Sequence, residues 1–151
     1  MKLTTKVRYA VSAMCDLATN DGTGKPVQVK DIASRQNISV LYIEQIFNKL
    51  KRAKLIRSVR GPHGGYMLAD KPSRINIGDI FRVVEGPIAL VGCVDKGPSK
   101  MSCVMSGRCS TKPLWAKLSK LIGDLLDSTT LADLCLPTGP LRREASKAGR
   151  G

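Results

Sequence analysis

Residues 29–50 constrain the fold of this chain more than any other stretch. Apolar residues first recur at the spacing of a short helix, which ends near Asn37, a residue type that tolerates the left-handed backbone of a sharp turn. Ser39 then predicts the start of a second helix, because its side chain can cap a helix N-terminus. The apolar side chains of that helix recur at i, i+3, i+4 and i+7: Ile43, Ile46, Phe47 and Leu50. This pattern predicts a helix-turn-helix.

A short β-hairpin is predicted directly after the second helix. Residues 55–60 alternate apolar and polar side chains, residues 61–65 form a glycine-rich turn, and residues 66–69 supply a second strand. Arg60 lies near the tip of this hairpin. A helix-turn-helix followed by a basic hairpin is a winged helix, so we expect a mainly α fold with a small β-hairpin wing.

Two further helices are predicted to complete this domain. The first has its apolar face at Val7, Ala10, Val11, Met14 and Ala18. The second begins after Asn76, a favourable N-cap residue, and has its apolar face at Ile77, Ile80, Phe81 and Val84. We therefore expect a winged-helix domain over residues 1–86.

The second half of the chain is predicted to form a loop and a long helix. Residues 87–111 have few large apolar side chains after residue 93, which predicts a cysteine-bearing loop. Beyond Pro113, apolar residues recur at spacings of three and four: Leu114, Leu118, Leu121, Ile122, Leu125 and Leu126. Such a helix needs a partner, and we expect a second copy in a two-fold homodimer. Residues 112–135 are thus the predicted dimerisation helix region, and residues 136–151 a disordered tail.

The charge of the chain indicates a polyanionic partner. Lys and Arg number 25 against 12 Asp and Glu, which gives a net charge of +13. Between residues 45 and 61 six cations occur with no acidic residue: Lys49, Lys51, Arg52, Lys54, Arg57 and Arg60. Because this run overlaps the predicted helix-turn-helix and wing, we expect a double-stranded DNA operator as the partner.

Six residues are candidates for contacting DNA: Ser39, Leu41, Glu44, Gln45, Lys49 and Arg60. A glutamate can accept from cytosine N4, a glutamine can pair with adenine, and an apolar side chain can meet a thymine methyl. Lys49 is suited to phosphate. Arg60 is suited to a narrow minor groove. The alternative is that these side chains form an ordinary solvated surface.

Five cysteines, an odd number, do not make a closed disulfide set. Cys93, Cys103 and Cys109 have the spacing C-x9-C-x5-C on a loop rich in Gly and Ser, where thiolates can converge on one metal centre. The closely spaced pairs typical of zinc are missing, and the wider spacing suits an iron–sulfur cluster. Three unpaired thiols are the alternative. Cys15 and Cys135 are each expected to be a small buried hydrophobe.

Membrane and enzyme functions are not expected. No stretch approaches the roughly 20 apolar residues of a membrane span. Residues 1–10 contain Lys2, Lys6 and Arg8 without an apolar stretch behind them, so we expect no signal peptide and a cytoplasmic protein. With one histidine, His63, and neither a C-x2-C motif nor a Ser/His/Asp constellation, the sequence does not predict a catalytic site.

Three stretches resemble the IscR/NsrR/RirA-type family of winged helix-turn-helix transcription regulators. They are MKLTTKVRYAVSAMCDLA at the start, DIASRQNISVLYIEQIFNKLKRAKLIRSVRGPHGGYMLA in the middle, and CSTKPLW after the cysteines. The RGP-x-GGY pattern of the wing is the most specific of these marks. The resemblance extends over residues 1–134.

This resemblance implies a homodimeric regulator with a long dimerisation helix and a three-cysteine loop that binds an iron–sulfur cluster. It implies that Glu44 reads a base and that Arg60 is the wing arginine. It also implies that the cluster ligands are Cys93, Cys103 and Cys109.

Two cluster-ligand positions depart from the family pattern. Lys112 stands where IscR has a histidine ligand, and Arg8 stands where some relatives have an acidic ligand. The fourth ligand and the cluster type, 2Fe-2S or 4Fe-4S, are therefore left open. The alternative function is a regulator of the same architecture without a cluster, which senses redox by cysteine oxidation or responds to a partner protein.

Overall fold

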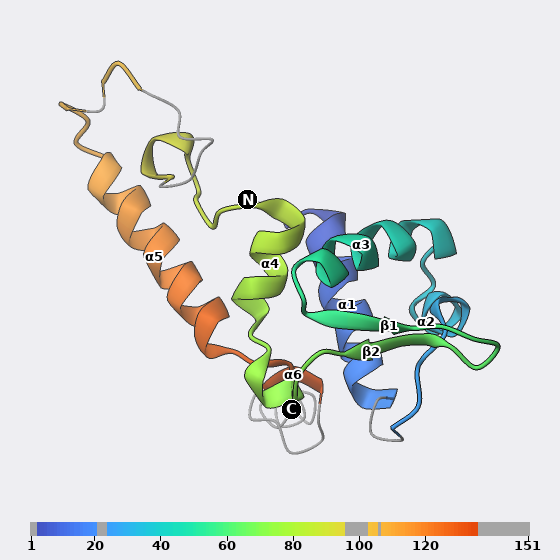
Figure 1. Ribbon diagram of the computed structural model, residues 1–151. Helices are drawn as coiled ribbons and strands as arrows, with labels where there is room; N and C mark the ends of the chain where they lie inside the picture. The colour runs from blue at the N-terminus through green and yellow to red at the C-terminus, as the bar shows by residue number, and fades with distance from the viewer. Residues whose placement is uncertain (1–2, 21–23, 96–102, 106, 136–151) are drawn as a thin grey trace, which may run out of the picture.

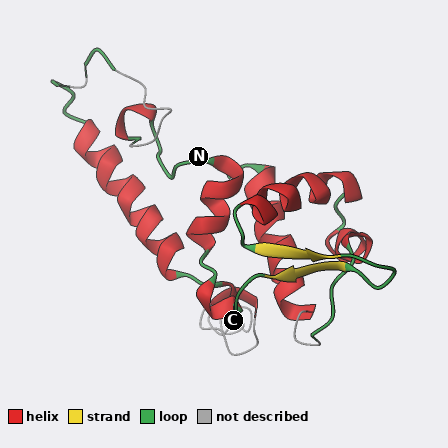
Figure 2. Cartoon of the chain, viewed as in Figure 1, coloured by secondary structure: helices red, strands yellow, loops and turns green. Residues whose placement is uncertain are grey.

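The computed structural model describes residues 3–20, 24–95, 103–105 and 107–135 (Figure 1). Its elements are α1 (Thr5–Asn20), α2 (Val29–Gln36), α3 (Val40–Arg52), β1 (Ile56–Val59), β2 (Gly65–Leu68), η2 (Pro72–Arg74), α4 (Ile77–Glu85), η3 (Gly92–Val94), α5 (Lys112–Ser128) and α6 (Leu131–Cys135). The fold is mainly helical with one antiparallel hairpin, as predicted (Figure 2). The predicted tail, residues 136–151, lies outside the described residues. None of the described helices is long and apolar enough to cross a bilayer.

The turn between α2 and α3 has the geometry that the sequence predicts. Asn37 adopts the left-handed conformation, with a φ of 53°. The next N–H, from Ile38, donates to the carbonyl of Ala33 at 3.0 Å and so satisfies one of the last carbonyls of α2. The Ser39 hydroxyl accepts from the backbone N–H of Tyr42 at 3.2 Å and caps α3. The helix-turn-helix prediction is confirmed.

The hairpin is fastened to the segment that precedes α2. Ile56 of β1 lies opposite Leu68 of β2 in the antiparallel register. Tyr66 exchanges two backbone hydrogen bonds with Val27, at 2.8 and 2.9 Å. A Cβ atom at Gly65 would run into the carbonyl of Val27, so the close approach requires glycine. Gly65, the second glycine of the GGY motif, therefore fixes where the second strand of the wing begins.

The hydrophobic core lies between α1, α2, α3, α4, α6 and the inner side of the hairpin. Its largest fully buried side chains are Met14, Leu17, Ile32, Ile43, Phe47, Leu50, Ile56, Ile80 and Leu131. The predicted apolar face of α3 is completely buried in this core. Burial of that face fixes the opposite face of α3 toward solvent.

After α4 the chain leaves this core, and α6 returns to it. Figure 1 shows α5 beside α4, on the side of the molecule away from the hairpin. Beyond α5, the backbone N–H of Ile77 donates to the carbonyl of Thr129 at 2.8 Å, and that of Leu131 donates to Ile75 at 2.9 Å. Leu131 is fully buried, and α6 packs on α1. The junction of α5 and α6, and α6 itself, are thus tied to the winged-helix core.

The expectation for two of the five cysteines is wrong. Cys15 and Cys135 are not separate buried thiols: a disulfide joins them across the interface of α1 and α6. The physical reason is the return of α6 to the core, which brings the two ends of the described chain together. Cys93, Cys103 and Cys109 remain free thiols.

Candidate nucleic-acid interface and cysteine loop

The outward face of α3 presents the side chains that were predicted to read bases. Leu41, Glu44 and Gln45 are all exposed, on the side of the helix opposite the core. Leu41 is 66% exposed and its neighbour Val40 is 42% exposed. Large apolar side chains in such positions favour contact with a partner. Val40 is absent from the sequence candidates, although its place at the first turn of the recognition helix is a signal for inclusion.

The remaining candidate residues lie at the edges of this face. Ser39 is exposed at the start of α3, where its hydroxyl oxygen caps the helix and its O–H proton stays available for donation. Lys49 is exposed near the other end of the helix. Arg60 lies on a different element, directly after β1, and is exposed. The structure therefore brings five candidates together on α3 and puts Arg60 on the wing.

Aromatic contacts set the position of the wing relative to α3. The rings of Phe47 on α3 and Tyr66 on β2 meet edge to face, with centroids 5.0 Å apart. On the other side of α3, Tyr9 and Tyr42 make a similar contact between α1 and α3, at 5.7 Å. These two ring contacts thus hold α3 between α1 and the wing.

A buried carboxylate holds α2 against α1. Asp16 on α1 accepts from Arg35, with nitrogen–oxygen distances of 2.7 and 2.9 Å, and from the Gln36 amide at 3.0 Å. The hydrogen bond to Asp16 raises the pKa of Arg35 above its already high value. Since Asp16 is buried and fully bonded, the first helix of the helix-turn-helix has one fixed orientation on α1.

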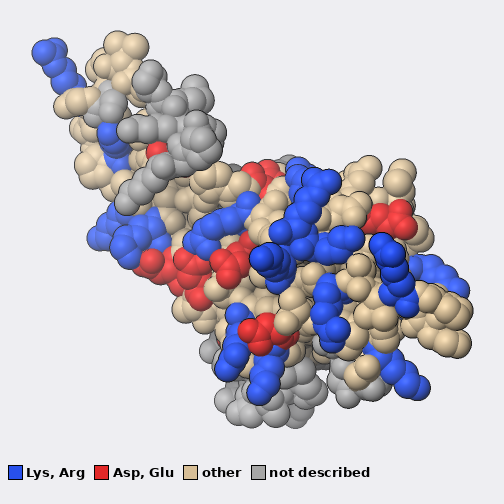
Figure 3. Space-filling view, viewed as in Figure 1, with Lys and Arg blue, Asp and Glu red and all other residues tan. Residues whose placement is uncertain are grey.

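Positive side chains cover the surface around these elements. In Figure 3 Lys and Arg are spread over the half of the molecule that contains α1–α3 and the hairpin. The exposed cations of α3 and the wing include Lys49, Lys51, Arg52, Lys54, Arg57 and Arg60. Such a field attracts the phosphate backbone of nucleic acid.

Two contacts hold α5 in place, one to the winged domain and one to residues 87–111. Arg82 of α4 forms a two-pronged ion pair with Asp127 of α5, which raises the pKa of Arg82 and lowers the pKa of Asp127. Nearer the cysteine loop, the backbone N–H of Leu90 donates to the buried hydroxyl of Ser119 at 3.0 Å. The first contact fixes α5 on α4, and the second fixes it on the segment that follows α4.

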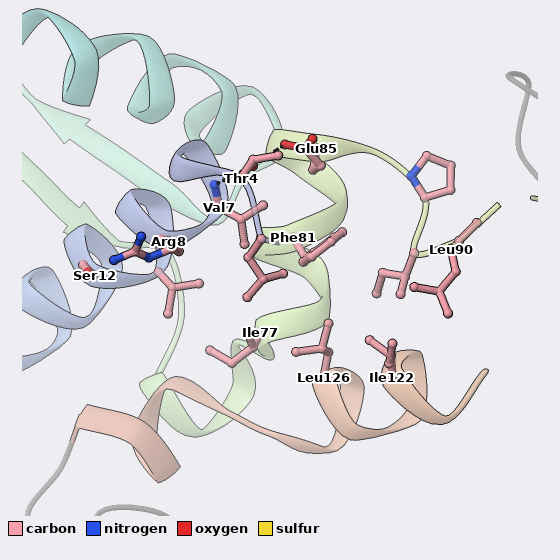
Figure 4. A pocket seen from close by; sticks show the side chains of 15 residues that line it. Thr4, Val7, Arg8, Ser12, Ile77, Phe81, Glu85, Leu90, Ile122 and Leu126 are labelled. Atoms are coloured by element: carbon pink, nitrogen blue, oxygen red, sulfur yellow. Dashed lines mark hydrogen bonds between the residues drawn. The ribbon is translucent and has the colours of Figure 1, made fainter. Parts of the chain in front are cut away.

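A cavity of about 710 Å³ lies between α1, α4, α5 and residues 87–90 (Figure 4). Its walls are mostly apolar and include Val7, Val11, Phe81, Leu90, Ile122 and Leu126. Arg8 and Glu85 also line it, and the Thr4 hydroxyl donates to Glu85 at 2.8 Å. Arg8, which stands at the family's acidic ligand position, is thus part of an apolar groove on α1.

The three loop cysteines lie apart along the segment between α4 and α5. Cys93 is half-buried in η3, Cys103 is exposed, and Cys109 is half-buried just before α5. Among the described residues, no three His, Cys, Asp or Glu side chains gather as a metal site. The Thr111 hydroxyl, 3.3 Å from Cys109 Sγ, and the backbone N–H groups of Thr111 and Lys112 lower the pKa of the Cys109 thiol. Cys109 thus has increased thiolate character.

The fold and its basic outward face define a winged helix-turn-helix DNA-binding regulator. Residues 3–137 match the model of the Rrf2 family, described as an iron-dependent transcriptional regulator. The chain belongs to the Rrf2 family. Because its relatives are transcriptional regulators, it is a regulator and not an enzyme.

Relatives and solved structures agree with this assignment. The HTH-type transcriptional regulator IscR of Aliivibrio salmonicida is 44% identical over 134 residues, 89% of this chain and 77% of that protein. The structure of T. potens IscR has a TM-score of 0.72 and 40% identity, over 98% of this chain and 90% of the other. CymR, the global cysteine regulator of B. subtilis, has a TM-score of 0.72 and 38% identity, over 89% and 96%. The predicted resemblance is confirmed.

Proposed function

We propose that this protein is a homodimeric, sequence-specific DNA-binding regulator, active in the cytoplasm, whose affinity for an operator depends on an iron–sulfur cluster at its three-cysteine loop. In each subunit α3 enters the major groove and the wing reaches the neighbouring minor groove. One observation carries the DNA-binding part. Leu41, Glu44 and Gln45 point outward from a helix whose other face is buried, beside the cations of the helix end and the wing.

The exposed residues have complementary tasks in this proposal. Glu44 accepts from cytosine N4, Gln45 pairs with adenine, and Leu41 packs on a thymine methyl. Ser39 and Lys49 contact the sugar–phosphate backbone of DNA, and so they orient α3 without reading the base sequence. Arg60 enters the minor groove, where the negative potential is strongest when the groove is narrow.

The outer stripe of α5 supports a two-fold dimer. Leu121 is 56% exposed and Leu125 is 62% exposed, and Leu114 and Leu118 continue the same stripe. The other side of α5 lines the apolar cavity with Ile122 and Leu126. An apolar helix face beside an apolar groove is self-complementary, so two copies can bury both surfaces in one isologous interface.

The chemistry of the loop fits an iron–sulfur cluster. Cys93, Cys103 and Cys109 are free thiols, and the lowered pKa of Cys109 makes it easier to form the thiolate that a cluster requires. When bound, the cluster would supply a redox- and oxygen-sensitive group whose gain or loss changes the loop. The Leu90–Ser119 hydrogen bond connects that loop to α5. A change in the loop can therefore alter the relation between the dimer helix and the DNA-binding elements.

A regulator without a cluster is the second candidate. The described residues contain no ready-made group of three ligands, and the CymR structure of similar fold belongs to a protein described as a cysteine regulator. In this alternative the loop thiols sense redox directly or the protein responds to a partner protein.

Two measurements test the proposal. Selection of duplexes from a random pool by the parent protein should enrich a pseudo-palindrome whose half-sites are about one helical turn, or a multiple of it, apart. An absorption spectrum of anaerobically prepared protein, with iron and sulfide analysis, should report a cluster. Enrichment of no sequence would refute the DNA-binding proposal. If a duplex sequence is enriched but the anaerobic protein contains no iron and sulfide, the regulator without a cluster is the remaining candidate.

A further inference from the structure

A disulfide joins two residues that are 120 positions apart in the sequence. Cys15 lies on α1, and Cys135 is the last residue of α6. Their Cα atoms are 5.3 Å apart, a separation at which a disulfide forms without movement of the backbone. The bond closes a loop that includes α2 to α5 and the hairpin.

The packing of α6 keeps the two cysteines close even without the bond. Leu131, one turn before Cys135, is fully buried, and its backbone N–H donates to Ile75. The Asp133 carboxylate accepts from the backbone N–H and the hydroxyl of Thr130, both at 2.9 Å, and so caps the helix. The reduced thiols would therefore stay within reach of one another.

The two sulfur atoms differ in their access to solvent. Cys15 is partly exposed, whereas Cys135 is 4% exposed. A small reagent reaches Cys15 first, and Cys135 is then placed to attack the sulfur of Cys15. This is the arrangement of an attacking thiol with a resolving thiol.

We infer that Cys15 and Cys135 form a reversible thiol–disulfide site whose co-reactant is a low-molecular-weight disulfide. The Cys15 thiolate attacks one sulfur of that disulfide, and one small thiolate leaves. The Cys135 thiolate then attacks Cys15 Sγ, and the second small thiolate leaves. Two electrons pass from the protein to the small disulfide, and the two cysteine protons end on the two released thiols. In a reducing compartment, a protein disulfide is usually transient and redox-sensing.

The site is positioned to affect the helix-turn-helix. Asp16, the residue after Cys15, anchors α2 through Arg35 and Gln36. The same turn of α1 therefore holds α6 on one side and α2 on the other. Oxidation fixes the end of the α5–α6 unit to this turn, and reduction loosens it. The effect on DNA affinity, which rests on the proposed function, is tighter binding by the oxidised protein.

Peptide mapping tests the site in the full-length parent. Trypsin sites separate all five cysteines, since Cys15 falls in residues 9–30 and Cys135 in residues 121–142. Fully reduced protein is incubated with glutathione disulfide, blocked with an alkylating reagent, and digested. We expect these two peptides to be recovered linked, with both thiols protected together and released by a dithiol reductant. Persistent alkylation of both cysteines, or linkage of either one to a loop cysteine, would overturn the site.

Thermal melting and DNA binding test the consequence. The oxidised parent should melt about 10 °C above the reduced parent, since the closed loop is long. It should also bind its selected duplex about fivefold more tightly, at the lower end of typical coupling between sites. Both differences should vanish in Cys15→Ala and Cys135→Ala. A shift that persists in these variants, or equal DNA affinities of both parent states, would overturn the coupling. Loss of DNA binding in both states would contradict the proposed function instead.

Discussion

Arg82 on α4 and Asp127 on α5 are joined by two parallel hydrogen bonds, with Nη1 2.7 Å from Oδ1 and Nη2 2.7 Å from Oδ2. Asp79 lies 3.5 Å from the same guanidinium. This ion pair connects the last helix of the winged domain to the helix that we propose as the dimer contact. Its geometry contributes to the angle between the two helices, and in the dimer that we propose this angle would contribute to the spacing of the two DNA half-sites.

The contribution of this ion pair should depend on pH. Arg82 lowers the pKa of Asp127, so the folded state favours the charged carboxylate more than the unfolded state does. The stabilisation is therefore complete at neutral pH and is lost as the pH falls through the lowered pKa. Both side chains are about two-fifths exposed, which limits the effect to about 1 kcal/mol or less.

Urea unfolding of the parent and Asp127→Asn at several pH values checks this. The difference in free energy of unfolding should be present at pH 7 and disappear as the pH falls through the lowered pKa of Asp127. Asp124→Asn is the control, because Asp124 pairs with Lys120 within α5 and does not join two helices. A difference that stays constant with pH would show that Asp127 does not act through its charge.

Two glycine-to-alanine substitutions should differ in their effect on stability. A Cβ atom at Gly78 on α4 would collide with the Asp127 carboxylate and approach Arg82 Nη1 to 3.0 Å, whereas a Cβ atom at Gly123 on α5 would meet nothing within 4 Å. Gly123→Ala should stabilise the protein by about 0.5–1 kcal/mol through helix propensity. Gly78→Ala should not be stabilised in this way, because the new Cβ atom displaces the Arg82–Asp127 ion pair. Thermal melting of both variants checks this, and equal stabilisation would contradict it.

An acidic residue in the outer stripe of α5 should disrupt the dimer. Leu121→Glu places a charge where we propose that two apolar helices meet, and an unpaired charge is costly to bury. We expect a monomer or an aggregate by light scattering at micromolar concentration. Lys117→Glu, on the charged side of the same helix, should leave the dimer intact. A parent protein that is monomeric under these conditions would refute the proposed assembly.

The visible colour of a bound iron–sulfur cluster should depend on the three loop cysteines. It should not depend on Cys15 and Cys135. Lys112 is a poor ligand in the usual fourth position, so a cluster would be lost more readily than in IscR. We expect coloured protein after anaerobic preparation and mostly apo protein after aerobic preparation. Alanine at Cys93, Cys103 or Cys109 should abolish the colour, whereas Cys15→Ala and Cys135→Ala should retain it. Colour that survives loss of a loop cysteine would favour the thiol-sensing alternative.

Local signals in the sequence were sufficient to predict the winged helix. Asn37 and Ser39 mark the helix-turn-helix boundary by backbone conformation and capping, which depend on neighbouring residues only. The glycine pair before Tyr66 marks the wing in the same way. The exposed face of α3 followed from the period of its buried face. Roles of Glu44 and Arg60 at individual bases stay predictions.

Long-range relationships could not be predicted in this way. The Cys15–Cys135 disulfide depends on the return of α6 to α1, and no periodicity within either helix encodes that contact. The odd cysteine count and the expected reducing compartment also argued against a disulfide. The apolar groove beside Arg8 likewise exists only because α1, α4 and α5 meet.

Fluorescence anisotropy with the selected duplex and a random duplex tests directly whether α3 and the wing read DNA. Glu44→Ala should relax preference at one base pair, by about 1–3 kcal/mol, and leave affinity for the random duplex unchanged. Arg60→Ala should weaken operator binding by removing the minor-groove contact. Lys49→Ala should lower affinity for both duplexes and reduce the salt dependence. If Glu44→Ala and Arg60→Ala bind both duplexes as the parent does, α3 and the wing are not the DNA-reading surface.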